Sequence, residues 1–595
     1  MQDLYRRSIE LFPGNLAFRR RVDRDRRSSD QLGELPAAVP LERRKSRGTG
    51  PVYENWTFAQ VDEWTSVLTG ALLDMGVRKG DRIAILSDNR PEWAIAYFAI
   101  VCVGAVAVPL DRSLTPMEIE NLLTHAQARF VVAPSNYTDT LRAVVEKVAT
   151  VESVSCMEPC ADAPRLISPQ TLRKRGEASR RTYREVSIDP ADPASIVYTS
   201  GTTGNPKGVV ITHANLTAQI DAMMDVHPLE PADLFLSVLP MNHLYEFVGG
   251  FLGPWVFGAC VVYPGSITPS RLMEAFRDCH VTRLCGVPVL FTLLYDEVAA
   301  KVAALPGWKK ALFYGSMEFA RTARTMLRVN PGKLLFKPIH QGFGGHLKSI
   351  ICGGAALEPE VAQRIEDAGF TVAIGYGLSE TSPVVSVGYV AKMPVGSVGK
   401  PIPGVEVRVE YPDAAGVGEL LVRGHNVMQG YYNDPVRTAE VLRDGWFHTG
   451  DLARIDKNGF IFICGRIKDM IVTPGAKKVF PEDLEYYYGR VDQVKEICVV
   501  GLPREDGLGD EPVAYVVPQE TTPRTEGSRG RTETEIRARF AEMSAKLPNF
   551  KRVRKLVFRS KGLPKTPSLK VRRFKVRELL ATARELAKKT RPPGG

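Results

Sequence analysis

Two periods of apolar and polar positions alternate along the N-terminal part of the chain. Residues 57–75 carry apolar side chains at helical spacing, between a capping box and a glycine, which predicts an amphipathic helix. Short apolar runs at 82–86 and 105–110 predict strands, and Asn-Arg-Pro at 89–91 predicts the start of another helix. Strands that alternate with helices in this way predict βαβ units, a mostly parallel sheet and the α/β class.

Two stretches without charged residues, 93–110 and 247–264, approach the length of a membrane span. Glycine and proline interrupt both of them, so we predict a buried helix that runs into a buried strand in each case. The basic segment 306–343 is expected to form additional helices outside the regular alternation, a helical excursion. The polar, basic segment 24–50 is expected to be a flexible insertion.

The chain becomes more charged from residue 468 onward, which predicts a small separate domain. A loose polar loop is expected at 521–531 and a helix at 532–547. The strand-like runs of this part are 494–500, 512–517 and 553–558.

Size and charge narrow the function classes. A chain of 595 residues is too long for a single core. Its net charge of +11 suits anionic ligands such as ATP and CoA, and also an anionic membrane surface. No zinc-finger, RNP or basic-zipper pattern occurs, so a nucleic-acid partner is not expected.

The cysteines and the N-terminus indicate the compartment. The nine cysteines are scattered without a Cys-x-x-Cys pair, and the first residues contain no apolar signal region. We therefore expect a cytoplasmic protein, with peripheral contact to a membrane left open. The sequence is compatible with a monomer and with a homodimer.

A loop rich in hydroxyl groups and glycines lies between two apolar runs, 196–198 and 209–211, and is expected to join two strands. Its glycines permit close approach of the backbone, and its hydroxyls and amides suit a polyphosphate, to which Lys207 adds a positive charge. Proline precedes and glycine follows this lysine, so the loop is not a Walker motif. A polar surface turn is the alternative. The loop residues are Thr199, Ser200, Gly201, Thr202, Thr203, Gly204 and Lys207.

This loop is similar, nearly letter for letter, to the phosphate loop of the adenylate-forming superfamily, which contains acyl-CoA synthetases, luciferases and peptide-synthetase adenylation domains. Seven segments between about residues 50 and 575 match the family's motifs in order. The resemblance implies a large N-terminal domain, 1–467, of sheets flanked by helices, with a distorted β-barrel subdomain. A small α+β lid domain, 468–595, would follow, with Lys468 at the hinge.

The segment 375–383 follows an apolar run at 370–374, so we expect it to be a loop at the end of a strand. It resembles the family's second nucleotide motif. The resemblance implies that Tyr376 and Gly377 lie along the adenine and that Ser379 bonds the α-phosphate. Glu380 would hold Mg²⁺, which prefers carboxylate, phosphate and water oxygens. A turn glutamate exposed to solvent is the alternative.

Two further motifs would complete the nucleotide site. Gly353, Gly354 and Ala355 belong to a glycine-rich segment that would line the adenine and the acyl pocket, although paired glycines are common in ordinary turns. Asp451 would hold the ribose hydroxyls, because a carboxylate can accept both of their protons, and Arg466 would reach the ribose or a phosphate.

Three more residues receive roles from the resemblance alone. Lys570 would be the catalytic lysine of the last motif, although leucine at 569 replaces the usual glycine and a basic surface turn is the alternative. Gly475 would leave room for the pantetheine arm of CoA. His243 would be a gate at the mouth of the acyl tunnel, with a core histidine as the alternative.

The implied reaction has two steps. A carboxylate attacks the α-phosphorus of ATP to give an acyl-adenylate and pyrophosphate, and a thiol, most simply that of CoA, then displaces AMP. Lys570, the loop with Thr202 and Glu380 with its Mg²⁺ would stabilise the first transition state. The segments 375–383 and 306–343 most resemble long-chain fatty acid–CoA ligases, which implies a fatty acid substrate. A fatty acyl-AMP ligase that loads a carrier protein, and a catalytically silent scaffold on a membrane or a partner, are the rival interpretations.

Overall fold

The structure is a computed structural model of the chain. It divides into two compact units, an N-terminal unit of Met1–Glu406 with Val422–Phe447 and a C-terminal unit of Val407–Leu421 with His448–Gly595. The predicted domain boundary at residue 467 and the hinge at Lys468 stay predictions, because a division into compact units does not show about which residue one unit rotates. The residues that the structure describes are 1–22, 52–179, 182–199, 206–474, 477–504, 509–519, 526–559, 562–565 and 571–589.

A largely parallel sheet of eight strands forms one half of the N-terminal unit, counted over the described residues. The predicted strands at 82–86 and 105–110 are β3 and β4, and they pair in parallel. Toward one edge, β8 and β9 are antiparallel, as is expected for two consecutive strands that a short loop joins. The strands in spatial order are β19 (Gly430–Tyr431), β9 (Lys207–Thr212), β8 (Pro193–Thr199), β4 (Val106–Leu110), β3 (Arg82–Leu86), β5 (Phe130–Ala133), β6 (Ser153–Cys156) and β7 (Leu166–Ile167).

A second sheet of nine described strands forms the other half. Its centre is parallel, and antiparallel strands close both ends. The order is β16 (Lys400–Pro401), β15 (Val384–Tyr389), β14 (Thr371–Gly377), β13 (Ser349–Cys352), β12 (Arg283–Gly286), β10 (Leu234–Leu236), β11 (Cys260–Tyr263), β1 (Leu16–Val22) and β2 (Val52–Thr57). The predicted mostly parallel α/β architecture is confirmed.

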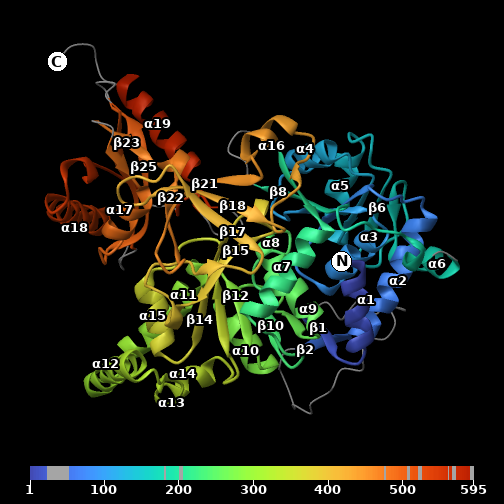
Figure 1. Cartoon of the computed structure of the whole chain (residues 1–595), viewed down its shortest axis with the longest axis horizontal. Helices are drawn as coiled ribbons and strands as arrows, with labels where there is room; N and C mark the ends of the chain where they lie inside the picture. Colours follow the sequence, from blue (N-terminus) through green and yellow to red (C-terminus); the bar gives the residue numbers. More distant parts are fainter. Residues whose placement is uncertain are drawn as a thin grey trace. The chain divides into compact units, whose positions relative to one another are not determined.

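Helices cover these sheets (Figure 1). The predicted amphipathic helix is α2, Phe58–Asp74, and the predicted capping box at its start is present. The other helices of the N-terminal unit are α1 (Gln2–Leu11), α3 (Pro91–Cys102), α4 (Pro116–Ala126), α5 (Thr138–Val145), α6 (Pro169–Ala178), α7 (His213–Val226), α8 (Leu244–Glu246), α9 (Gly253–Val256), α10 (Pro269–Cys279), α11 (Pro288–Ala303), α12 (Gly307–Thr322), α13 (Gly332–Leu335), α14 (Lys337–Gly342), α15 (Pro359–Asp367) and α16 (Pro435–Val441).

The two charge-free stretches are buried helices that lead into strands, as predicted. The first forms α3 and β4, and the second forms a π-helix at Phe247–Leu252, α9 and β11. None of the helices in the described ranges combines the length and the hydropathy that crossing a bilayer requires. The helical excursion predicted at 306–343 is also present, as α12, a π-helical turn, α13 and α14.

The C-terminal unit contains the three predicted strands as β25 (Val494–Pro503), β26 (Asp510–Pro518) and β27 (Lys555–Phe558). The polar loop predicted up to residue 531 is wrong in its second half, because α18 spans Glu526–Ala545. Backbone hydrogen bonds extend this helix through residues that carry no apolar pattern. The apolar spacing alone therefore places the start of the helix too late. The predicted insertion at 24–50 lies outside the described residues.

The remaining elements include a five-stranded sheet, counted over the described residues, where the resemblance implies a distorted barrel. Its strands are β17 (Val405–Glu410), β18 (Gly418–Gly424), β20 (Leu442–Arg443), β21 (Trp446–Ile455) and β22 (Ile461–Arg466). The other elements are β23 (Ile471–Thr473), β24 (Lys477–Val479), α17 (Pro481–Tyr488) and α19 (Arg573–Lys589).

An aromatic cluster ties the first helix of the chain to the core of the N-terminal unit. Trp255 on α9 is fully buried, with the ring of Tyr5 stacked on it at 5.6 Å between centroids. Phe58 and Phe98 lie 4.4 and 4.6 Å from the same ring. Segments from four distant parts of the sequence therefore share one apolar contact.

We expect Trp255→Ala to destabilise the N-terminal unit by about 3–5 kcal/mol, because it leaves a cavity among rings that cannot collapse onto it. Thermal unfolding followed by circular dichroism measures the change. Met117→Ala is the control, since Met117 is 68% exposed and its loss should leave the midpoint nearly unchanged. Equal midpoints for the two variants would contradict the assignment of this cluster to the core.

Candidate active site

A buried carboxylate with two partners lies in the N-terminal unit. Glu380 sits in a short 3₁₀ turn, Ser379–Thr381, that follows β14. Its Oε1 accepts a hydrogen bond from Lys207 Nζ at 2.9 Å and another from the Tyr431 hydroxyl at 2.9 Å. Lys207 Nζ also lies 4.2 Å from the centre of the Tyr431 ring, within reach of a cation–π contact.

Strand pairing brings these three side chains together. Lys207 begins β9 and lies opposite Thr199, the last residue of β8. Tyr431 on β19 pairs with the other edge of β9, opposite Val209. The backbone N–H of Met428, just before β19, donates to the Glu380 carbonyl at 2.9 Å. The end of the predicted phosphate loop and the predicted metal ligand are thus neighbours.

Charge balance keeps Glu380 ionised. Burial alone would raise its pKa, but the adjacent Lys207 ammonium and the hydrogen bond from Tyr431 outweigh burial and hold the pKa below its ordinary value of 4.5. Burial and the carboxylate raise the pKa of Tyr431, which therefore remains a hydrogen-bond donor. The site at neutral pH is an ion pair with a neutral phenol.

Two residues predicted to lie on a loop are on a strand instead. Tyr376 and Gly377 belong to β14, because β15 continues to pair with the strand beyond its apolar run. A Cβ at Gly377 would lie 1.8 Å from the Pro383 carbonyl oxygen, so only glycine fits there. Tyr376 and Ser379 are half-buried, and their predicted nucleotide contacts stay predictions.

The glycine-rich segment follows the end of β13. Gly354 has φ +80°, a conformation that favours glycine, and Ala355 is exposed. A Cβ at Gly353 would lie 3.2 Å from the ring of Tyr245, whose hydroxyl donates to the Ile351 carbonyl at 2.8 Å. The backbone here is held close to an aromatic ring, and the predicted roles in the adenine and acyl pocket remain predictions.

Asp451 and Arg466 face each other in the C-terminal unit. Strands β21 and β22 are antiparallel with these two residues in register, and Arg466 Nε lies 2.7 Å from Asp451 Oδ1. Asp451 is buried. The sheet itself therefore brings together the two residues that the resemblance assigns to the nucleotide. Lys468 follows in an exposed 3₁₀ turn.

His243 is half-buried at the start of α8, with its Nε2 atom buried, so the alternative of a core histidine stays open. Its Nε2 lies 3.9 Å from Asp111 Oδ2. Burial lowers the pKa of His243 more than this carboxylate raises it, so the imidazole is neutral at pH 7. A neutral side chain is compatible with the predicted gate, which stays a prediction.

Several predicted site residues lie outside the described residues, and their roles stay predictions. They are Ser200, Gly201, Thr202, Thr203, Gly204, Gly475 and Lys570. Tyr431, in contrast, is a site residue that sequence reasoning missed. Nothing in the spacing of a tyrosine 224 positions after Lys207 indicates the contact, which depends on the pairing of β19 with β9.

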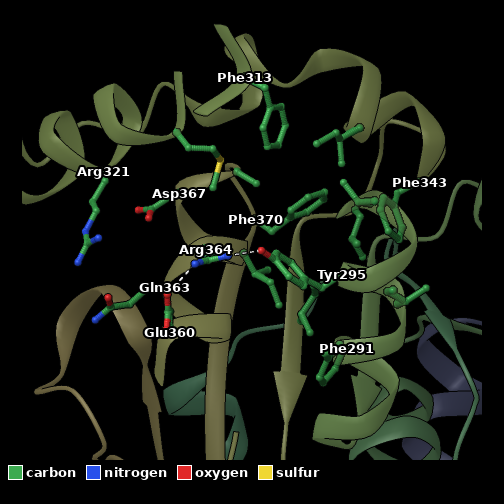
Figure 2. A pocket seen from close by; sticks show the side chains of 18 of the residues that line it. Phe291, Tyr295, Phe313, Arg321, Phe343, Glu360, Gln363, Arg364, Asp367 and Phe370 are labelled. Carbon is green, nitrogen blue, oxygen red and sulfur yellow. Dashed lines mark hydrogen bonds and ion pairs between the residues drawn. The ribbon is translucent and has the colours of Figure 1, made fainter. Parts of the chain in front are cut away.

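A cavity of about 320 Å³ lies in the N-terminal unit, between α11, α12 and α15 on the face of the second sheet. Phe313 from α12 and Phe370 before β14 point into it (Figure 2). Charged side chains lie toward one end, where Arg364 donates to Glu360 at 2.6 Å and also contacts Tyr295. The resemblance implies an acyl tunnel, but none of the sequence motifs indicates these lining residues.

The matches to known proteins agree with this geometry. Residues 37–432 match the AMP-binding enzyme family, and residues 483–570 match the AMP-binding enzyme C-terminal domain. The chain belongs to the AMP-binding enzyme family. It is an ATP-dependent, AMP-forming acid–thiol ligase, which forms an acyl-adenylate and then a CoA thioester.

Curated members of the family cover most of the chain. The long-chain-fatty-acid–CoA ligase FadD15 of Mycobacterium bovis is 30% identical over 78% of this chain and 80% of its own length. The peroxisomal long chain acyl-CoA synthetase 7 of Arabidopsis thaliana is 30% identical over 77% of this chain and 68% of its own. ATP-bound MatB from Rhodopseudomonas palustris, 23% identical, has the same fold, with a TM-score of 0.72 over 97% of this chain and 98% of MatB.

We expect Tyr431→Phe to move the acid limb of the pH profile for pyrophosphate exchange to higher pH. The pKa of Glu380 rises when the hydroxyl that lowers it is lost, so the carboxylate predicted to hold Mg²⁺ is protonated at a higher pH. At pH 7.5 the rate should change by less than about tenfold, since one hydrogen bond is removed.

Tyr432→Phe is the matched control for this experiment. Among the residues that the structure describes, the Tyr432 hydroxyl donates to the Ala126 carbonyl, at 3.5 Å, and forms no hydrogen bond with Glu380. Its variant should keep the wild-type acid limb. An acid limb that is the same in both variants would mean that Tyr431 does not influence Glu380 in the active enzyme.

Proposed function

We propose that this ligase activates a medium- or long-chain fatty acid and transfers it to CoA. The observation that carries the proposal is the apolar cavity beside the second sheet, lined by Phe291, Phe313 and Phe370 among others. A chain of methylene groups fits such a lining, whereas a short or charged acid would leave it unfilled. The names of the two relatives above, both long-chain ligases, support the same substrate class.

The position of the cavity relative to Glu380 favours a long chain. Phe370 lines the cavity and immediately precedes β14, which ends at Gly377, three residues before Glu380. Seven steps along a strand at about 3.3 Å each make about 23 Å. An acid whose carboxylate is activated near Glu380 therefore needs a long tail to reach the cavity.

We assign the first half-reaction to the phosphate loop and the cluster around Glu380. Ionised and buried beside a cation, Glu380 suits Mg²⁺, which would supply charge neutralisation on the phosphates of ATP. Lys207 lies close enough to share that work, with the hydroxyls of Thr202 and Thr203 as further donors. Asp451 would hold the ribose, and Arg466 would reach the ribose or a phosphate.

The second half-reaction would use the C-terminal unit differently. Lys570 would assist adenylate formation and then leave as the unit turns about Lys468. The face that contains Gly475 would then admit the pantetheine thiol, which attacks the adenylate carbonyl and releases AMP. Keeping water out during this exchange protects the mixed anhydride.

The direct experiment measures CoA-dependent AMP release with carboxylic acids from acetate to oleate, together with aryl acids. We expect kcat/KM to be largest for medium or long fatty acids. A preference for acetate or for an aryl acid would contradict the proposal, and transfer to a holo-carrier protein but not to CoA would favour the rival fatty acyl-AMP ligase. No AMP release with any acid would leave only the silent scaffold.

Lys570→Ala should lower pyrophosphate exchange by at least about a hundredfold, because a positive charge is lost from the transition state of adenylate formation. Thioesterification of supplied acyl-AMP should change little. Lys575→Ala is the control, since Lys575 is an exposed residue of α19. Equal losses in both half-reactions would remove the role assigned to Lys570.

Met317→Trp should shorten the acids that the enzyme accepts. Met317 lines the cavity from α12, and the indole would fill part of its volume. We expect kcat/KM for palmitate to fall at least about tenfold, while the value for octanoate stays within about twofold. Thr322→Trp, on an exposed position of α12, is the control. A uniform effect on both acids would place the acyl chain elsewhere.

A further inference from the structure

The segment from Leu305 to Leu335 exposes an unusual amount of apolar surface. It has 31 residues, yet it contains ten of the 22 large hydrophobic side chains that are exposed among the described residues. Trp308 is 67% exposed and Leu334 80% exposed. The ten are Leu305, Trp308, Leu312, Tyr314, Phe319, Met326, Leu327, Val329, Leu334 and Leu335. Large apolar side chains that are exposed together in one segment are typical of an interaction site.

Helix α12 is apolar on two opposite faces. Phe313 and Met317 point toward the cavity and the core, and Ala320 is fully buried beside them. Trp308, Leu312 and Phe319 are spaced by four and seven residues, which places them on one face, on the other side of the helix. The packing of the N-terminal unit explains the first face and leaves the second without a partner among the described residues.

The charge of the same segment is strongly positive. Residues 305–337 contain seven lysines and arginines and one acidic residue, Glu318. Arg324 pairs with Asp367 at 2.7 Å, but Lys309, Arg328, Lys333 and Lys337 are exposed. The Lys309 ammonium lies 5.3 Å from the centre of the Trp308 ring, so apolar and basic groups are interleaved.

We propose that this segment, α12 to α13, docks the protein on the surface of an anionic lipid bilayer. Basic side chains would meet the lipid phosphates while Trp308, Leu312 and Phe319 enter the boundary between headgroups and acyl chains. Tryptophan is favoured at that depth because its ring is apolar and its N–H is polar. A second protein surface would not require this excess of positive charge.

The location in the fold fits a bilayer contact. Helices α12 and α13 lie at the edge of the N-terminal unit, beyond the strands of the second sheet (Figure 1). The apolar cavity lies directly behind α12 (Figure 2). If the proposed function holds, docking would place this cavity next to the phase in which long-chain acids concentrate.

The test is co-sedimentation of the full-length protein with vesicles of phosphatidylcholine containing about 30% phosphatidylglycerol. We expect binding to these vesicles that is at least tenfold stronger than to pure phosphatidylcholine and that weakens at high salt. Leu312→Asp with Phe319→Asp should weaken it at least tenfold, and so should Lys309→Glu with Lys333→Glu.

Each variant has a matched control. Val395→Asp with Val436→Asp places two acids on other exposed apolar positions of the same unit, and Lys174→Glu with Lys392→Glu reverses two other exposed charges. Octanoate turnover without vesicles should match the wild type in all four variants, which shows that they are folded. The residues changed in α12 do not line the cavity.

Two outcomes would overturn the inference. The first is a failure of the binding assay: either the wild type does not bind the vesicles, or the variant Leu312→Asp with Phe319→Asp binds them as strongly as its control does. The second is that the wild type is a dimer and that only Leu312→Asp with Phe319→Asp makes it monomeric, with vesicle binding unchanged. The exposed face of α12 would then be a subunit interface. Vesicle binding needs neither ATP nor CoA, so a protein that does not bind vesicles could still have the proposed function. Conversely, a protein without ligase activity could still bind vesicles.

Discussion

The ion pair between Lys207 and Glu380, with Tyr431 as a second donor, is the interaction on which the site depends. A carboxylate as deeply buried as Glu380 is costly unless a cation and hydrogen bonds compensate it, and removal of one partner typically costs about 3–5 kcal/mol. The three side chains come from β9, the turn after β14 and β19. Three distant segments must therefore be assembled before the charge can be buried.

This assembly suits the phosphate chemistry that we propose for the site. Lys207 is the first residue of β9 and the last residue of the predicted phosphate loop, and Glu380 lies in the short 3₁₀ turn that follows β14. Groups that are fixed before the substrate arrives lose little entropy in the transition state. Strand β14 also separates the polar cluster from the apolar cavity. The polar cluster follows the carboxyl end of this strand, and the cavity lies near its amino end.

Much of the fold and part of the site could be predicted from the sequence. Strong local signals located α2 with its capping box, the strands β3 and β4, and the β8–β9 pair around the phosphate loop. Lys207 and Glu380 followed from motifs, but Tyr431 did not, because its contact is created by the non-local pairing of β19. The start of α18 and the extension of β14 were missed for a related reason, since backbone hydrogen bonds continued beyond the apolar pattern.

A crystal structure of the protein with ATP and Mg²⁺ would show whether Lys207 and Glu380 form the nucleotide site. We expect a metal ion on the Glu380 carboxylate, with the Lys207 ammonium turned toward a phosphate oxygen and the triphosphate along residues 199–207. A nucleotide bound elsewhere, with the Lys207–Glu380 hydrogen bond unchanged and no metal at Glu380, would contradict it.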